Sequence, residues 1–388
     1  MLDEMVEESR SADSSQKEKF RIKISKKDFV KSLAHVQSVV EKRNIIPVLS
    51  NVLLNAEDST LTITATDMDI IFSEKVSADV IDAGSVTVSA HLLYEIIRKL
   101  DDNSSAELVQ RENNLMEIIS STCTFSLNTL PAKDFPKIED DGYNTRYSLS
   151  AEDLIASVDK VKFSISNEET RYNLNGVFCH SEDGAALQFV STDGHRLSIN
   201  NTKDVKSLKS FDGVIIPRKA ILELRRVIED LESDISVDFS DNKIKFSAAN
   251  FVMITKLIDA KFPSYKSLIP SDNNLDLSIN REQLIKAIDR VSTINNEKFR
   301  GIKLEFEGRS LTLTSSGDAG GVATESIEIG SDAGEKFDIG FNAKYLLEIM
   351  SILKGKNVIC RFKDSFSPVV IIEEGNDNYQ HILMPMRV

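Results

Sequence analysis

The chain has 388 residues, which is more than one ordinary hydrophobic core accommodates and suits two or three domains. Its 61 acidic and 47 basic residues give a formal net charge of −14, which over the whole chain argues against nucleic-acid binding. Cys123, Cys179 and Cys360 lie far apart, and no apolar run approaches about 18 residues. The sequence therefore indicates no disulfide framework, zinc site or membrane span, and favours a reducing, cytoplasmic compartment.

The N-terminal stretch, residues 1–19, is acidic and rich in serine. A secretory signal would instead have a basic start followed by an apolar segment. We therefore expect a disordered, solvated tail here.

From residue 20 onward, one pattern occurs six times: an alternating apolar strand, a small polar residue or proline, and an amphipathic helix. Serine and asparagine at the turn can accept a backbone N–H of the first helical turn, and proline lacks an N–H where none is needed. The six turn positions are Ser25, Ser89, Ser150, Pro217, Asn280 and Asn342. We expect the Ser and Asn side chains to cap five helices, and Pro217 to stand at the start of the remaining one.

The segments between the helices alternate apolar and polar residues and break at Asp, Gly and Ser, which is typical of β-strands. Corresponding helices recur at roughly 125–130 residues, so the larger repeat is a domain of two units. The sequence predicts an α+β fold of three repeated domains, 20–143, 144–271 and 272–388. Each domain would pack two helices on antiparallel sheets.

Charge is distributed unevenly along this repeat. The helical segments 21–43, 90–100, 151–163, 217–228, 280–300 and 342–356 together carry a formal +12, so the remainder carries −26. The simple explanation is that helices carry solvated Lys and Arg. If the six helices share one side of an assembly, that side could attract a phosphate backbone without reading sequence.

The stretch "STDGHRLS" raises the possibility of a hydrolytic site made by Asp193, His195 and Ser198. Residues two apart in a strand share a face but do not reach one another, so a triad within one hairpin is disfavoured. Asp193-Gly194 instead predicts a hairpin turn that displays His195 and Arg196 just after it. With no phosphate-binding loop and no cluster of metal ligands, the sequence predicts a protein that is not an enzyme and needs no cofactor or metal.

The C-terminus, "YQHILMPMRV", is too apolar for a frayed end. It would either pack in the last domain as an edge strand or line a binding groove, for which methionine is well suited.

Five motifs then indicate a family: "RYNLNG" (171–176), "TDGHRL" (192–197), "FPSYKSLIP" (262–270), "NEKFRG" (296–301) and the terminal "MPMRV". In combination they resemble the bacterial DNA polymerase III beta subunit, the replicative sliding clamp, from about residue 20 to the C-terminus. The resemblance implies a head-to-tail homodimer that closes into a ring around duplex DNA, with helices lining the hole. Such a ring tethers the polymerase and makes synthesis processive.

The resemblance also implies a cleft that binds short peptides with apolar anchors. The expected partners are the polymerase III catalytic subunit, the clamp-loader ATPase, and other polymerases and repair proteins. The matching positions are Leu174, Thr192, Gly194, His195, Arg196, Leu197, Pro263, Leu268, Pro368, Ile382, Leu383, Met384, Pro385, Met386 and Arg387. In this assignment His195 and Arg196 fix polar ends of the peptide, and Leu268 and Ile382 stand where valine is expected.

For DNA, the resemblance implies contacts from Arg43, Arg218 and Lys219. Glu168 stands where the family usually has glutamine, which puts a further loop contact in doubt because a carboxylate repels phosphate.

For the subunit interface, the resemblance implies that Phe125 and Leu127 meet Ile294 of the partner, and ordinary core packing is the alternative for these three residues. Thr293 replaces a more apolar neighbour, so the ring should open somewhat more readily.

Two other functions stay open at this point. A hydrolase would lose turnover on substitution of His195, and a scaffold for proteins alone would not be retained on circular DNA.

Overall fold

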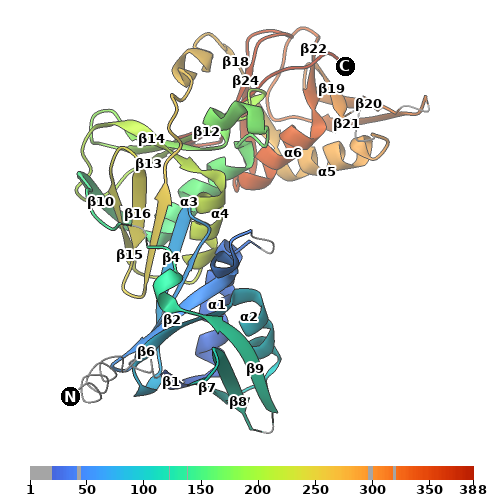
Figure 1. Cartoon of the computed structure of the whole chain (residues 1–388). Helices are drawn as coiled ribbons and strands as arrows, with labels where there is room; N and C mark the ends of the chain where they lie inside the picture. The colour runs from blue at the N-terminus through green and yellow to red at the C-terminus, as the bar shows by residue number, and fades with distance from the viewer. Residues whose placement is uncertain (1–19, 42–44, 122, 138, 296–299, 318–319) are drawn as a thin grey trace, which may run out of the picture. The chain divides into compact units, whose positions relative to one another are not determined.

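The computed structural model describes residues 20–388 except 42–44, 122, 138, 296–299 and 318–319. The expected N-terminal tail and Arg43 therefore lie outside the described residues. The chain divides into two compact units (Figure 1). The first runs to Asp141 and includes Ser247–Ile254, and the second comprises Gly142–Phe246 and Thr255–Val388.

In the part of the chain that the structure describes, the first unit contains two α-helices and an antiparallel β-structure. Its elements are β1 (Arg21–Ser25), α1 (Lys26–Val39), β2 (Asn51–Glu57), β3 (Thr60–Thr66), β4 (Ile70–Ser77), β5 (Asp79–Asp82), β6 (Gly84–Ser89), α2 (Ala90–Lys99), β7 (Ser105–Arg111), β8 (Leu115–Ser120) and β9 (Cys123–Leu130). Strands pair in the orders β6–β2–β3–β4 and β5–β1–β7–β8–β9. Helices α1 and α2 pack against each other, and α1 also covers β3 and β4.

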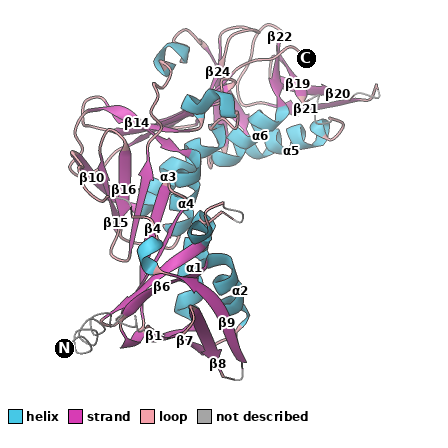
Figure 2. Ribbon diagram, in the orientation of Figure 1, coloured by secondary structure: helices cyan, strands magenta, loops and turns pink. Residues whose placement is uncertain are grey.

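The second unit contains two copies of a closely related arrangement. The first copy has β10 (Thr145–Ser150), α3 (Ala151–Val161), β11 (Gly176–Ser181), β12 (Leu187–Thr192), β13 (Arg196–Thr202), β14 (Phe211–Pro217), α4 (Arg218–Val227), β15 (Asp234–Phe239), β16 (Lys243–Ser247) and β17 (Phe251–Lys256). Most of β17 falls in the stretch 247–254 that is assigned to the first unit. The second copy has β18 (Leu275–Asn280), α5 (Arg281–Ser292), β19 (Gly301–Glu307), β20 (Ser310–Ser316), β21 (Val322–Glu328), β22 (Phe337–Asn342), α6 (Ala343–Ile352), β23 (Asn357–Phe362), β24 (Val369–Glu373) and β25 (Asn376–Leu383). Helices α5 and α6 lie side by side (Figure 2).

Strand pairing confirms the threefold repeat. The order β6–β2–β3–β4 recurs as β14–β11–β12–β13 and as β22–β19–β20–β21. The pair β1–β7 likewise recurs as β10–β15 and β18–β23. Within the second unit, β13 pairs with β25, so the two copies share one eight-stranded sheet, β14–β11–β12–β13–β25–β24–β23–β18. The predicted α+β class with helices on antiparallel sheets is therefore confirmed.

The strands form because their apolar residues alternate and one face can be buried. In β19, Ile302, Leu304 and Phe306 are buried while the intervening residues are not. The helices bury one stripe each, as Leu154, Val158 and Val161 do in α3. Each core therefore lies between the helices and the sheet faces they cover.

The capping prediction holds for three of the five Ser and Asn positions. Asn342 accepts N–H bonds from Lys344 (3.0 Å) and Tyr345 (3.4 Å), and Ser150 and Asn280 cap α3 and α5 in the same way. The prediction is wrong for Ser25 and Ser89, whose side chains make no capping bond, while Pro217 precedes α4 as expected.

A backbone bond recurs at the first residue of five of these helices. The N–H of Lys26 in α1 donates to the carbonyl of Ser104 at 3.0 Å. The same bond joins Ala151 to Ser233, Arg218 to Asn175, Arg281 to Lys356 and Ala343 to Arg300. A carbonyl distant in the sequence therefore satisfies the first helical N–H, while the caps at Ser150, Asn280 and Asn342 accept later N–H groups of the first turn.

Candidate functional site

The hairpin between β12 and β13 carries the "TDGHRL" motif. Thr192 pairs with Leu197, so residues 193–196 form the turn. The Asp193 carboxylate accepts the backbone N–H groups of His195 (2.9 Å) and Arg196 (3.1 Å). The Thr192 hydroxyl accepts the N–H of Gly194, whose positive φ of 89° suits glycine. The predicted turn is confirmed, and its backbone is held rigidly.

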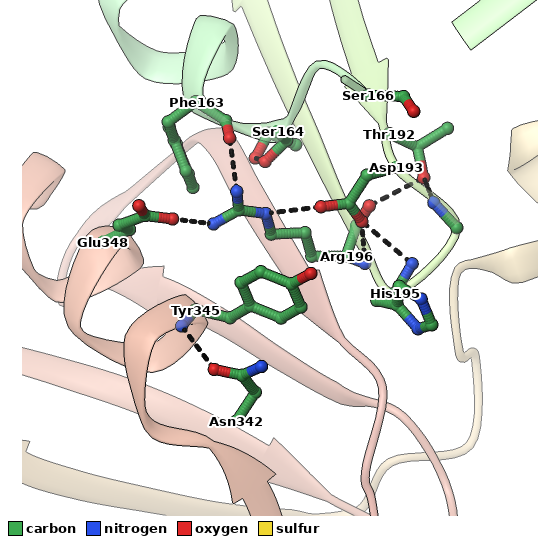
Figure 3. A network of polar contacts seen from close by, with 12 residues as sticks. Phe163, Ser164, Ser166, Thr192, Asp193, His195, Arg196, Asn342, Tyr345 and Glu348 are labelled. Carbon is green, nitrogen blue, oxygen red and sulfur yellow. Dashed lines mark hydrogen bonds and ion pairs between the residues drawn. The ribbon is translucent and has the colours of Figure 1, made fainter. Parts of the chain in front are cut away.

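Arg196 lies at the centre of a polar network that joins the two copies in the second unit (Figure 3). Its Nε donates to Asp193 at 3.0 Å, and its two terminal nitrogens donate to the Glu348 carboxylate of α6 and the Phe163 carbonyl. The guanidinium carbon also lies 4.3 Å from the ring centre of Tyr345. Only 7% of Arg196 is exposed, so the prediction that the turn displays this side chain is wrong. The planar guanidinium donates to three acceptors at once, so its burial leaves few donors without a partner.

The hydrolytic alternative finds no support in these contacts. The Ser198 hydroxyl lies 2.9 Å from His381 Nδ1 and 2.7 Å from the Ser164 hydroxyl, while the Asp193 carboxylate is engaged by Arg196 and the turn. The His195 ring instead stacks on Tyr345, with ring centres 6.2 Å apart. Asp193, His195 and Ser198 therefore do not converge as nucleophile, base and orienting group.

The predicted apolar residues divide into buried and exposed sets. Leu174, Leu197 and Ile382 pack together in one buried cluster that draws on both copies of the second unit. Leu383 is fully buried in the core of the last copy and cannot offer its side chain to a ligand. Leu268, Met384 and Met386 are exposed by 51%, 43% and 41%. The predicted peptide-binding residues therefore include buried side chains that pack in the core and exposed apolar side chains that are open to contact.

The loop that carries Pro263 and Leu268 is fixed to β11 by aromatic contacts. The Phe262 ring stacks on Phe178 with 4.8 Å between ring centres, and the Tyr265 hydroxyl lies 2.9 Å from His180 Nε2. Burial lowers the pKa of His180 and raises that of Tyr265 to about 12, so both groups stay neutral at ordinary pH. The loop is therefore held by neutral groups and stacking.

The sequence analysis did not select three further residues: Arg171 and Tyr345, which contact the turn at residues 193–196, and Phe366, which is close to Pro368 in the sequence. Arg171 donates to the Asp193 carbonyl at 3.2 Å, and Tyr345 packs against both His195 and Arg196. Phe366 is 85% exposed two residues before Pro368, in a turn that the Asp364 carboxylate holds. Arg171 lies within the "RYNLNG" motif and could have been selected, whereas Tyr345 follows an ordinary helical pattern.

A cavity of about 740 Å³ borders the Arg196 network on the helical side. It is lined by Phe163, Ser292, Asn295, Arg300, Ala343, Lys344, Leu347, Glu348, Ser351 and Ile352. None of the predicted peptide-binding residues lines it, although it shares Phe163 and Glu348 with the network.

Of the residues expected to contact DNA, Arg218 and Lys219 lie in helix α4, and Arg43 is outside the described residues. Glu168, which puts a further loop contact in doubt, directly precedes η4 (Glu169–Leu174). Arg218 and Lys219 are the first two residues of α4 and are half-buried. Further along α4, Arg225 pairs with Asp159 at 3.1 Å, so part of the helical positive charge is neutralised locally. Glu168, which stands where the family usually has glutamine, pairs with Arg171 at 3.1 Å. The guanidinium offsets the negative charge of this carboxylate.

The residues expected at the subunit interface differ in exposure. Phe125 in β9 is 37% exposed, whereas Leu127 is only 7% exposed. Ile294 and the exposed Thr293 follow the end of α5. Phe125 is therefore the better placed of the two β9 residues for contact with a second chain.

Family models of the DNA polymerase III beta subunit match nearly all of the described chain. The N-terminal domain matches residues 19–139, the central domain 148–264 and the C-terminal domain 266–387. The beta sliding clamp of Caulobacter vibrioides is 39% identical over 372 residues, covering 95% of this chain and all of that protein. That of Rickettsia felis is 37% identical over 377 residues, covering 94% of this chain and 99% of that protein.

Solved structures agree with these sequence relationships. The C. crescentus beta sliding clamp superposes with a TM-score of 0.92 at 39% identity, covering 96% of this chain and all of that one. The Bartonella birtlesii sliding clamp bound to griselimycin gives 0.91 at 38% identity, covering 95% and 100%. With three matched domains in order and near-complete coverage, the chain belongs to the DNA polymerase III beta subunit family of sliding clamps, the non-catalytic processivity factors of that polymerase.

Proposed function

We propose that two copies of this chain close head to tail into a ring around duplex DNA, with β21 of one copy paired to β9 of the other. The observation that carries this proposal is the pairing of β13 with β25, in which Arg196–Asn200 runs antiparallel to Tyr379–Leu383. When the order β14–β11–β12–β13 is aligned with β22–β19–β20–β21, β21 corresponds to β13. When β18–β23–β24–β25 is aligned with β1–β7–β8–β9, β9 corresponds to β25. A head-to-tail contact that closes produces a ring.

Both strands present backbone that is open to pairing. Among the described residues, β21 pairs with β20 alone, and none of its side chains is fully buried. In the same described part of the chain, β9 pairs with β6 only through Thr129 and Leu130, which leaves Cys123–Asn128 with one neighbour, β8. Unpaired edges of this length favour addition of a further strand.

Within such a ring, sequence-independent contacts to the phosphate backbone are sufficient, because a closed ring cannot leave DNA without opening. Arg43, Arg218 and Lys219 are the residues we assign to these contacts. We assign opening to the clamp-loader ATPase, in keeping with the lack of a phosphate-binding loop in the sequence.

We further propose that the surface around His195 binds short peptides from the polymerase III catalytic subunit, the clamp loader, and other polymerases and repair proteins. Exposed Leu268, Met384 and Met386 supply an adaptable apolar surface, and the rigid turn at residues 193–196 supplies polar groups. The B. birtlesii relative was solved with griselimycin, and we expect this chain to bind the same compound here.

Fluorescence anisotropy tests this assignment with a fluorescein-labelled hexapeptide that ends in Leu-Phe. We expect saturable binding, displacement by griselimycin, and at least about tenfold weaker binding by Met384→Asp, because a carboxylate would be placed in an apolar contact. Leu92→Asp alters an apolar side chain of similar exposure on α2 and should leave binding unchanged. Equal loss in both variants would contradict the assignment.

A further inference from the structure

The last five residues follow β25 and are attached to both copies in the second unit. The N–H of Met384 donates to the His195 carbonyl at 2.9 Å, and the N–H of Met386 donates to the Gly340 carbonyl in β22 at 2.8 Å. Pro385 stands between the two donors and restricts the backbone there. The segment 384–388 is therefore anchored at the "TDGHRL" turn and at a strand of the last copy.

Two glycines lie beneath the end of this segment. Gly301 pairs with Asn342, and Lys303 pairs with Gly340, so both glycines lie on the same face of the β19–β22 pair. The opposite face carries buried residues, among them Ile302 and Phe341. The Val388 side chain occupies the space that β-carbons at the two glycines would need.

The need for glycine here is steric. An added Cβ at Gly340 would stand 2.3 Å from Val388 Cγ2 and 2.4 Å from the Met386 carbonyl oxygen, and one at Gly301 would stand 3.0 Å from Val388 Cγ1. Neither glycine has a positive φ, so alanine suits both backbone conformations. What alanine would disturb is the segment above, most strongly at Gly340 because a backbone oxygen is involved.

We propose that Gly301 and Gly340 form a shelf that seats residues 384–388, and that this seating positions Met384 and Met386 as a wall of the peptide-binding surface. The second part rests on the proposed function of that surface. A five-residue terminus with two backbone anchors would fray if one anchor were displaced, because chain ends are ordered only where they are tied down. Met384 and Met386 would then no longer offer one preformed apolar surface, and peptide binding would include the cost of ordering them.

Alanine substitutions with two readouts test the shelf. Hydrogen–deuterium exchange of the intact protein, read in the C-terminal peptide after digestion, reports how firmly residues 384–388 are seated. The affinity for the labelled hexapeptide that ends in Leu-Phe reports the state of the binding surface. We expect Gly340→Ala to speed exchange at residues 384–388 and to weaken peptide binding about tenfold. Gly301→Ala should have a smaller effect in the same direction, and adding Val388→Ala should reverse it by removing the clashing methyl groups. Gly321→Ala is the matched control, because its Cβ would meet nothing within 4 Å and its φ is not positive.

The outcomes separate the shelf from the proposed function. Unchanged exchange in Gly340→Ala would overturn the shelf. Faster exchange with unchanged peptide affinity would overturn the claim that seating shapes the surface. If the wild-type chain fails to bind the hexapeptide and griselimycin, the proposed peptide-binding function fails, while the exchange comparison still decides the shelf. Failure of Val388→Ala to reverse Gly301→Ala would also count against it.

Discussion

Arg196 is a predicted peptide-binding residue whose side chain is used almost entirely in contacts within the protein. It contacts Asp193, Glu348 and the Phe163 carbonyl and is almost entirely buried, so its contribution to peptide binding should come through the position of the turn. The sequence places Arg196 in the motif, but burial depends on α6, which lies about 150 residues further along the chain. A local pattern cannot reveal that contact.

Replacing Arg196 should therefore reduce stability as well as binding. We expect Arg196→Ala to lower the free energy of unfolding by about 3 kcal/mol, because three partly buried acceptors lose their donor. Glu348→Gln should cost less, since Glu348 is about one-third exposed. Urea denaturation measures both, and Lys344→Gln, which removes a distant 3.9 Å pair with Glu348, is the control. A loss in the control as large as that in Arg196→Ala would contradict this account.

His381 should make the stability of the protein depend on pH. Burial, with help from the nearby charges of Lys160 and Arg196, lowers the pKa of His381 from 6.5 to about 3. Below pH 6.5 the unfolded chain therefore binds a proton that the folded chain does not take up until about pH 3. Stability should fall as pH drops through this window, by up to about 1.4 kcal/mol per pH unit from this group.

The substitution His381→Gln isolates this effect, because glutamine retains a polar partner for Ser198 and cannot titrate. Urea denaturation between pH 7.5 and pH 4.5 should show a shallower loss of stability in the variant than in the wild type. Carboxylates contribute equally to both proteins, so the difference reports His381. Parallel curves would show that His381 has no such role.

At the scale of elements, helix caps differ in value although their sequences look alike. Asn342 accepts two backbone N–H bonds at the start of α6, whereas Ser89 makes none at the start of α2. Asn342→Ala should therefore lower the free energy of unfolding by about 1 kcal/mol, and Ser89→Ala should change it by only a few tenths. Urea denaturation of both variants measures these losses. An equal loss of unfolding free energy would mean that the observed capping bonds do not stabilise the helix.

The sequence predicts these elements well, because strand alternation and helical periodicity are local properties. It predicts Ser150, Asn280 and Asn342 as caps correctly and Ser25 wrongly. The local sequence does not explain the difference, because the bond from the first helical N–H, here from Lys26 to Ser104, is also present in α3, α5 and α6, where the side-chain caps do form. In the candidate site, too, local features are predictable and tertiary contacts are not. The turn at Asp193 was predictable, whereas the role of Tyr345 depends on packing between two copies of the repeat.

At the scale of the whole molecule, one kind of strand pairing would serve two purposes. Inside the second unit, β13 and β25 join two copies of the repeat through backbone hydrogen bonds. The same kind of joint between β21 and β9 of different copies would complete a ring from repeats that are already compatible. A few side chains on these two edges would then decide whether the ring stays closed.

Substitution of those side chains tests the ring directly. Static light scattering should give about twice the 43.3 kDa chain mass for the wild-type protein, and a lower, concentration-dependent mass for Phe125→Asp in β9 or Val322→Asp in β21. A carboxylate at either edge would be desolvated on pairing, which opposes association. Ile81→Asp changes a comparably exposed apolar side chain on β5 and should leave the mass unchanged. A wild-type monomer at all concentrations, or equal dissociation of the Ile81 variant, would contradict the β21–β9 joint.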